Sequence, residues 1–305
     1  MKNIAIIGLG NISIKYNEAL KARKDFNLVG LVDIKENALG IKHYPNVLFF
    51  STLKELFDNV KVDYLIIATP PSTHFKIIKQ AFLNKVNVFV EKVVALKMEE
   101  IKELKSLQKE FNTKLIPIYH WLYGNEVLAL KDFNIDINDL LKIEVIVFEN
   151  KLNEYDTVDD KYASLNGAVI DAYPNIFSLI EGAFMPLDKA ELYKISYDVS
   201  KYSPDIKKCN LTAFNKHVTL GLMVNWSKKE EMKKTILTFY NRTKLIIDHL
   251  NQSIEYNGKI YNYEKEDRLV SHYKNFFLRE DLFEDNINWL NIHKALFGLI
   301  KRTRH

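Results

Sequence analysis

The first 120 residues alternate between short apolar runs and stretches with helical spacing. The runs are NIAIIG, LVGLVD, NVLFF, VDYLIIAT, VNVFVE and TKLIPIY, and the helical stretches lie at about 12–22, 52–59, 73–85 and 97–110. Because the runs are almost continuously apolar, both faces of each strand are expected to be covered. Strand–helix alternation of this kind predicts an α/β domain at 1–122, built on a doubly wound parallel sheet.

The pattern changes after about Tyr123. KIEVIVFEN predicts a strand, a polar loop occupies 151–166, and helical spacing returns at about 171–184. We expect this helix to begin close to Pro174, since proline is tolerated in a first turn. Several of the following runs, from AELYKISYDVS to SIEYNG, alternate between apolar and polar residues. Such alternation is typical of an antiparallel sheet with one solvated face.

These patterns predict a second, α+β domain at 123–285 on an open, mostly antiparallel sheet. The charged run SKKEEMKK within it is expected to be a solvated hairpin turn. Helical spacing returns from Arg268 onwards. We expect a C-terminal helix at 286–305, with packing back on the first domain as one option.

Composition and charge narrow the class of protein. Of the 305 residues, 47% are hydrophobic and 27% charged, an ordinary globular balance. The net charge of +4 is too small and too evenly spread to indicate a nucleic-acid surface. No apolar run reaches the roughly 18 residues of a membrane span, and the N-terminus lacks a signal-peptide cleavage site. A cytoplasmic protein is expected, with no membrane or nucleic-acid partner.

Cys209 is the single cysteine of the chain. One cysteine cannot form an internal disulfide, and it excludes zinc sites that use several thiolates. The eight histidines show no i,i+4 pair, so no metal site is expected. We expect Cys209 to be inert packing.

The segment GLGNIS joins the first apolar run to the first helical stretch. Gly8 permits a tight turn, and Gly10 lets a pyrophosphate approach the backbone at the positive end of a helix. Asp33 closes the second run, about where an acid would hold ribose hydroxyls. A purely structural turn is the alternative, because Ser13 stands where the usual fingerprint has its third glycine.

This turn favours NAD as the cofactor. A carboxylate at position 33 would repel a 2′-phosphate, although the nearby Lys35 leaves NADP open. Besides the two glycines and Asp33, the expected cofactor contacts in this part of the chain are Asn11 and Ile12.

GLGNIS, Asp33, ATPPSTHF at 68–75 and VFVEKVVAL together resemble the glucose–fructose oxidoreductase/inositol dehydrogenase family, often called Gfo/Idh/MocA. The resemblance covers nearly the whole chain, a Rossmann nucleotide domain followed by a sheet domain. It implies hydride transfer between a nicotinamide cofactor and a sugar-like alcohol in the cleft between the domains. The cofactor contacts that it implies after the fourth and fifth strands are Thr69, Pro70, Ser72, His74, Glu91 and Lys92. His74 is equally expected to cap the following helix.

Lys92 stands at the carboxyl end of a strand, where open parallel sheets bind ligands. It matches the lysine of the family's Glu-Lys-Pro motif, and Val93 departs from the proline, which would fix the backbone after the lysine. The resemblance makes Lys92 the catalytic residue that exchanges a proton with the reacting hydroxyl. The alternative is a lysine that reaches from a strand end into solvent.

GAVIDAYPNIF places Asp171 and Asn175 four residues apart, on one face of a helix. The family usually has Asp and His at this spacing, whereas its sugar 1-dehydrogenases, acting on galactose or arabinose, have Asp and Asn. The resemblance implies that Asp171 is the base or orients the base, and that Asn175 binds a substrate hydroxyl. An amide cannot take up a proton, so Asn175 is not the base. The alternative for Asp171 is a helix N-cap or a first-turn acid.

Three further residues are candidates for substrate contact. His120 and Trp121 follow the sixth run, where the sugar dehydrogenases have a similar pair in reversed order. A packed domain junction is the alternative. Glu149 resembles a substrate-binding acid of the same branch, and a sheet-edge acid is the alternative.

We therefore expect an NAD(P)-dependent oxidoreductase that acts on CH–OH groups of a sugar, polyol or sugar derivative. A nucleotide-linked sugar is an alternative substrate. A different class stays open, a non-catalytic dinucleotide-binding sensor or scaffold, because Ser13, Val93 and Asn175 depart from the family pattern. By resemblance, a homodimer or homotetramer is expected to form through the C-terminal sheet, which light scattering can check.

Overall fold

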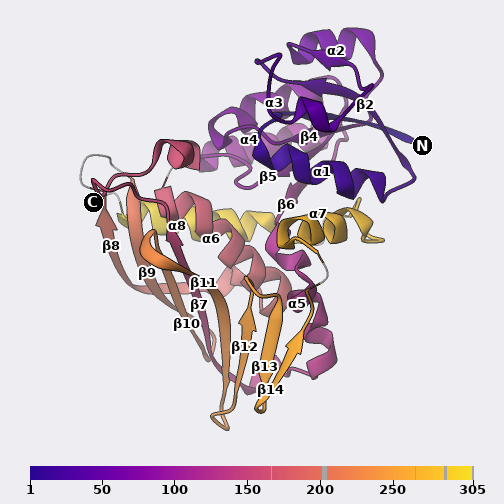
Figure 1. Cartoon of the computed structure of the whole chain (residues 1–305). Coiled ribbons are helices and arrows are strands. Elements are labelled where there is room, and N and C mark those ends of the chain that lie inside the picture. The colour runs from indigo at the N-terminus through magenta and orange to yellow at the C-terminus, as the bar shows by residue number, and fades with distance from the viewer. Residues whose placement is uncertain (166, 201–204, 265, 285–286, 304–305) are drawn as a thin grey trace. The chain divides into compact units, whose positions relative to one another are not determined.

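The chain folds into two compact units, each with its own sheet and core (Figure 1). The computed structural model describes residues 1–165, 167–200, 205–264, 266–284 and 287–303. Unit 1 comprises Met1–His120 and Leu269–Asn286, and unit 2 comprises Trp121–Arg268 and Ile287–His305.

Unit 1 is a six-stranded parallel sheet with the order β3-β2-β1-β4-β5-β6. Its strands are β1 (Lys2–Ile7), β2 (Phe26–Val32), β3 (Phe49–Phe50), β4 (Tyr64–Ile67), β5 (Asn87–Glu91) and β6 (Leu115–Ile118). Its helices are α1 (Asn11–Lys21), α2 (Leu53–Asn59), α3 (Pro71–Leu83), α4 (Met98–Glu110) and α7 (Arg268–Leu278) from Leu269 onwards. All residues of β4 and β6 are buried. The doubly wound sheet expected from continuous apolar runs is confirmed.

Unit 2 is built on an eight-stranded sheet with the order β14-β13-β12-β11-β7-β10-β9-β8. The strands are β7 (Leu140–Asn150), β8 (Glu191–Val199), β9 (Ile206–Asn215), β10 (Val218–Asn225), β11 (Ser227–Phe239), β12 (Lys244–Asp248), β13 (Ser253–Tyr256) and β14 (Lys259–Asn262). β10 and β7 run parallel, and the other neighbours are antiparallel. The mostly antiparallel sheet that the alternation predicted is confirmed.

One face of this sheet carries the core of unit 2. Along β7 and β10 buried residues alternate with half-buried ones. The helices α6 (Gly167–Leu179) and α8 (Trp289–Thr303) pack on each other, α6 also contacts β9 and β10, and α8 contacts β8 (Figure 1). A short helix, α5 (Asn125–Leu128), contacts β12. Cys209 is buried in this core, where Tyr173 donates a hydrogen bond to its carbonyl, and burial raises the pKa of its thiol to about 11. The expectation of an inert cysteine agrees with this environment.

Two local predictions are wrong. α6 begins at Gly167 and contains Pro174 in its interior, because nearly every residue of α6 is buried and this burial outweighs the hydrogen bond that proline cannot make. The run SKKEEMKK is not a hairpin turn but the first part of β11. The chain leaves β10 at Asn225, passes the end of β7 at Trp226, and enters β11 at once on the other side of β7.

The last forty residues divide between the units. α7 packs in unit 1 from Leu269 onwards, and α8 packs in unit 2. This division differs from the expected domains. They place residues 269–285 in the second domain and allow the C-terminal helix to pack on the first. Helical periodicity shows that a helix buries one face, but it does not show which sheet receives that face.

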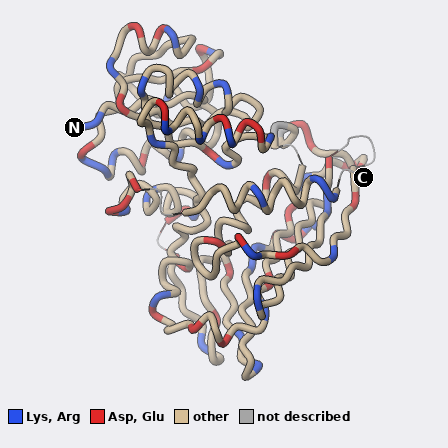
Figure 2. The backbone as a smooth tube through the Cα atoms, turned by 180° about the vertical axis from the view of Figure 1, so that it is seen from behind, with Lys and Arg blue, Asp and Glu red and all other residues tan. Residues whose placement is uncertain are grey.

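Charged residues of both signs are interspersed along the backbone of each unit (Figure 2). In the part of the chain that the structure describes, no helix is both long enough and apolar enough to cross a membrane.

Candidate functional site

The carboxyl ends of the strands in unit 1 carry the expected cofactor residues. Across the order β2-β1-β4-β5-β6, the residues that follow the strands are Asp33, Gly8–Gly10, Thr69–Ser72, Lys92 and His120. Neighbouring strands lie about 4.8 Å apart, so three spacings, about 14 Å, separate the strand ends at Asp33 and Lys92. The strand order reverses between β1 and β4, which is where open parallel sheets bind ligands.

The turn after β1 has the shape that a pyrophosphate site needs. Gly8 has a φ of +92°, and a Cβ there would lie 2.7 Å from the carbonyl carbon and oxygen of Ala68. A Cβ on the exposed Gly10 would meet nothing within 4 Å. Among the described residues no side chain caps the N-terminus of α1, so its first amide groups donate no hydrogen bond to a capping side chain. The open space and these amides fit the pyrophosphate of a dinucleotide.

Ser13 replaces the third glycine without opening the turn. It is buried, and its hydroxyl donates to the carbonyl of Gly10 at 2.7 Å. A Cβ on Gly40 would lie 2.4 Å from the Ser13 oxygen, so the glycine at position 40 provides the space that the serine takes. This departure from the fingerprint is therefore compensated within unit 1.

Asp33 connects the second strand to the glycine turn. One carboxylate oxygen accepts from the amide of Leu9 at 2.7 Å, and the other accepts from the amide of Lys35 at 2.9 Å. A carboxylate oxygen has two acceptor sites, so the half-buried Asp33 keeps capacity for ribose hydroxyls. The residues of this region thus fit NAD.

Glu91 lies inside unit 1, where it is 9% exposed. Its Oε1 accepts hydrogen bonds from the hydroxyls of Tyr16 at 2.5 Å and Tyr273 at 2.7 Å. These contacts link β5 to α1 and α7. Burial raises the pKa of Glu91 above its usual value, against the opposing effect of the two hydroxyls. The arrangement favours a structural role over the cofactor contact expected for Glu91.

This raised pKa predicts a specific dependence of stability on pH. The folded chain holds the Glu91 proton more tightly than the unfolded chain, so the free energy of unfolding falls as pH rises from the ordinary carboxyl value through the raised one. Glu91→Gln should remove this slope, by about 1.4 kcal/mol for each pKa unit of elevation. Urea titrations from pH 4.5 to 8 measure it. Tyr273→Phe should extend the slope to higher pH, and identical slopes in wild type and Glu91→Gln would contradict this role.

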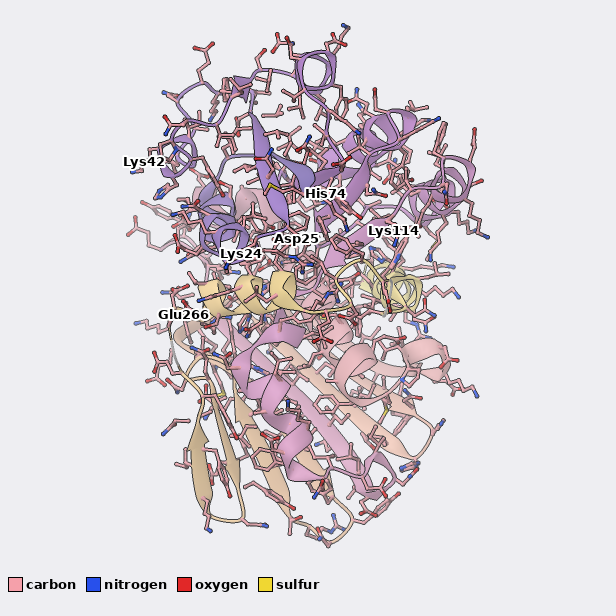
Figure 3. The ribbon with its side chains drawn as sticks, turned by 90° about the vertical axis from the view of Figure 1, so that its right-hand side faces the viewer. Lys24, Asp25, Lys42, His74, Lys114 and Glu266 are labelled. Atoms are coloured by element: carbon pink, nitrogen blue, oxygen red, sulfur yellow. The ribbon has the colours of Figure 1, made fainter. Side chains whose placement is uncertain are left out.

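His74 lies inside unit 1, where Figure 3 labels it, and is fully buried. Its Nδ1 lies 2.6 Å from the carbonyl of Val93 and its Nε2 lies 2.8 Å from the carbonyl of Thr69. Burial lowers the pKa of His74, against the effect of both carbonyls. Since both ring nitrogens face backbone carbonyls, this side chain holds the segments after β4 and β5 rather than capping α3. The peptide bond between Lys92 and Val93 is cis.

The other predicted residues of unit 1 lie at the same carboxyl end of the sheet. Pro70 precedes α3, Ser72 is exposed in its first turn, and the hydroxyl of Thr69 lies 2.6 Å from that of Thr73. His120 is buried, and its Nδ1 lies 3.0 Å from Nδ1 of His272 on α7. Asn11 is exposed at the start of α1, and Ile12 beside it is half-buried.

In unit 2, α6 carries Asp171 and Asn175 one turn apart. Asp171 is the fifth residue of α6, so it is neither an N-cap nor a first-turn acid. Asn175 is 6% exposed, and its side-chain oxygen is buried without a hydrogen-bond partner among the described residues. Burying an amide oxygen in this way costs roughly 1–3 kcal/mol. The position therefore suits an acceptor that a ligand hydroxyl completes.

The buried Glu149 and the half-buried Asp171 belong to one chain of ion pairs. Lys151 lies 2.6 Å from Asp171 Oδ2 and 2.9 Å from Glu149 Oε2, and Lys233 lies 2.7 Å from Glu149 Oε1. These lysines outweigh the effect of burial and lower the pKa of Glu149. β7 lies in the middle of the sheet, so Glu149 is not a sheet-edge acid.

Neither lysine was among the site residues predicted from the sequence. Lys151 directly follows a strand end, as Lys92 does, and this signal could have found it. Lys233 could not be found in that way, because its contact depends on the register in which Lys233 of β11 faces Val147 of β7.

Trp121 packs in unit 2. It is buried, and its ring centroid lies 4.9 Å from that of His249. His249 lies 2.9 Å from Glu126 and 2.9 Å from the hydroxyl of Thr235, all of them buried. Trp121 is thus part of the core of unit 2, and a substrate contact stays a prediction.

Comparison with known proteins extends this description. Residues 2–119 match the model of the GFO_IDH_MocA family, described as an oxidoreductase family with an NAD-binding Rossmann fold. Glucose-6-phosphate 3-dehydrogenase of Bacillus subtilis is 30% identical over 148 residues, which are 48% of this chain and 42% of that protein. Alignments with the first curated relatives cover 36–42% of the relatives' length.

Two solved structures share the fold over 98% of this chain. D-galactose-1-dehydrogenase from Rhizobium etli has a TM-score of 0.80 at 14% identity, covering 98% of this chain and 94% of that one. UDP-N-acetylglucosamine 3-dehydrogenase from Acidithiobacillus ferrooxidans has a TM-score of 0.77 at 16% identity, covering 98% and 95%. Together with the nucleotide-binding turn, the match shows that residues 2–119 of this chain carry the NAD-binding Rossmann fold of the Gfo/Idh/MocA oxidoreductase family.

Proposed function

We propose that this protein transfers a hydride between NAD and a CH–OH carbon of a sugar, a polyol or a sugar derivative. The observation that carries the proposal is the buried oxygen of Asn175, which lacks a partner among the described residues. It lies one helical turn from a half-buried, ion-paired acid, Asp171. A hydroxyl-rich substrate supplies the donor that this oxygen needs. The names of the similar sugar dehydrogenases support the same substrate class.

The proposal gives each unit its own task. When bound, NAD takes up the hydride in oxidation or returns it in reduction. In unit 1, Gly8–Gly10 bind the pyrophosphate, Asp33 binds a ribose, and Lys92 accepts the proton of the reacting hydroxyl. In unit 2, Asp171 accepts a hydrogen bond from a substrate hydroxyl, and Asn175 binds a neighbouring one. Contacts from His120, Trp121 and Glu149 to substrate stay predictions, because all three are buried and already packed or paired.

Asn175→Leu separates binding from folding. Leucine has the same number and branching of side-chain heavy atoms and removes a buried oxygen that lacks a partner among the described residues, so the melting temperature should stay equal or rise. The value of kcat/KM should fall roughly tenfold to hundredfold, since a substrate hydroxyl loses its acceptor. Thermal unfolding and NAD-dependent turnover on a panel of aldoses, polyols and sugar phosphates, in both directions, measure the two effects.

Asn291 provides the matched control. It is also 6% exposed in unit 2, but its amide donates to Glu181 at 3.1 Å. Asn291→Leu should lower the melting temperature and leave kcat/KM close to wild type. NAD binding without turnover on any member of the panel would contradict the proposal and favour a non-catalytic sensor or scaffold.

We also propose that two or four copies associate through the open face of the eight-stranded sheet. The support is the resemblance to the family together with the half-buried residues on that face, such as Ile146, Phe148 and Met223.

A further inference from the structure

We propose that Lys151 is a positioning residue for Asp171, holding its carboxylate ionised and in one orientation for substrate binding. The inference rests on the proposed function, because that function gives Asp171 its role. Lys151 itself is assigned no contact with substrate or cofactor.

The backbone of Lys151 is fixed on both sides. The residue follows the last residue of β7, the central strand that pairs with both β10 and β11. Its amide donates to the carbonyl of Trp226 at 3.1 Å, and its carbonyl accepts from the amide of Asp159 at 3.0 Å. Trp226 sits where the chain passes the end of β7 between two strands. The lysine side chain therefore starts from a backbone that cannot easily shift.

The ammonium group is then held from three directions. Two carboxylate oxygens, from Asp171 and Glu149, lie 2.6 and 2.9 Å from it. The ring of Trp226 lies 4.9 Å from it, a distance that suits a cation–π contact. The side chains of Lys151 and Asp171 are each only 12% exposed, so solvent screens this pair weakly. An ammonium fixed in this way allows the Asp171 carboxylate one favoured orientation.

Glu149 does not compete with Asp171 for this lysine, because it has a second cation. Lys233 on β11 binds the other oxygen of Glu149. The four charges alternate from Asp171 through Lys151 and Glu149 to Lys233, and they sum to zero. Burial disfavours the charged form of Lys151, but the two carboxylates outweigh it and raise its pKa. Lys151 is therefore charged at neutral pH.

Removing the charge of Lys151 would take away the ammonium that Asp171 and Glu149 share, and Glu149 would keep its ion pair with Lys233. Among the described residues, two further cations face this cluster: Lys233 from β11 and Arg268 at the start of α7, which interacts electrostatically with Glu149. The ring of Tyr162 lies 5.5 Å from the ammonium of Lys151. Two carboxylates without the shared ammonium disfavour double ionisation. One of them should then bind a proton at a pH where both are ionised in the wild type.

The experiment compares three variants. Lys151→Met keeps an unbranched side chain of nearly the same length but removes the ammonium group and with it the cation–π contact to Trp226, and Lys151→Arg restores the charge. Lys233→Met is the matched control, since it removes an ammonium from the same cluster but leaves Lys151 on Asp171. The first readout is the pH at which the ¹³C-labelled carboxyl carbon of Asp171 titrates in the protein without substrate, assigned by its loss in Asp171→Asn. The second is the acid limb of kcat/KM against pH, and NADH binding controls for unit 1.

We expect Lys151→Met to move the Asp171 titration and the acid limb upward by at least one pH unit, with kcat/KM at the plateau at least tenfold lower. Lys151→Arg should restore both, Lys233→Met should move them less, and NADH affinity should stay within twofold in all. An Asp171 titration unchanged in Lys151→Met would overturn the inference, as would an equal shift in Lys233→Met. If no sugar is turned over, the proposed function fails, while the carbon titration still decides whether Lys151 controls Asp171.

Discussion

Lys92→Met is expected to lower turnover by about 10²- to 10⁴-fold, the usual contribution of a positioned proton-transfer group. Lys92 follows the last residue of β5 and is half-buried. It lies at the carboxyl end of the sheet, as do Gly8–Gly10 and Thr69. His74 holds the carbonyl of the next residue, Val93, so the backbone beside the lysine is anchored. Methionine keeps the buried stem and removes the group that accepts the proton. Stopped-flow and steady-state assays with the best substrate of the panel measure the loss.

The control for this variant is Lys97→Met. Lys97 is exposed and precedes α4, five residues further along. It should turn over substrate at the wild-type rate. NADH fluorescence should show that Lys92→Met binds the cofactor within a few-fold of wild type. Wild-type turnover in Lys92→Met would refute the proton-transfer role, and a parallel loss of NADH binding would assign Lys92 to the cofactor instead.

The two glycines of the first turn should respond to alanine in opposite ways. Gly10→Ala adds a methyl group where nothing lies within 4 Å, at a backbone φ of −81° that alanine adopts freely. Its stability should change by less than about 0.5 kcal/mol. Its affinity for NAD should fall at least tenfold, about 1.4 kcal/mol, because the methyl occupies the space that the pyrophosphate needs.

Gly8→Ala should already destabilise the folded protein. Its Cβ would collide with the backbone of Ala68, and its φ of +92° is strained for any L side chain. We expect the free energy of unfolding to fall by roughly 1–3 kcal/mol or more, with loss of NAD binding as the turn moves. Calorimetry separates the two variants. A Gly10→Ala protein that binds NAD as tightly as wild type would exclude this turn as the pyrophosphate site.

The nucleotide-binding half could be predicted because its signals are local. Each parallel strand is a continuous apolar run, and the run ends where the chain turns at Gly8, Asp33, Thr69 or Lys92. Ligand-binding residues of such a sheet lie at the carboxyl ends of its strands, whatever the details of helix packing. These residues could therefore be named from their positions in the chain alone.

Local signals were less informative where burial of whole elements decided the outcome. Pro174 predicts a helix start, but α6 is buried almost throughout and continues seven residues before it. Glu91 follows the expected pattern of a strand-end residue, but α7 brings Tyr273 from a distant part of the sequence to its carboxylate. A charge at the end of a strand can point into the core when another element supplies its partners.

The sequence by itself determined the two kinds of sheet, the NAD-binding turn, and the spacing of Asp171 and Asn175 on one helix face, since each depends on residues close together in the chain. Only the tertiary structure decided that Lys151 pairs with Asp171, that Lys233 pairs with Glu149, and that the buried oxygen of Asn175 lacks a partner among the described residues. These contacts join residues from separate strands and helices. Their partners are set by strand register and helix packing, which no short stretch of sequence specifies.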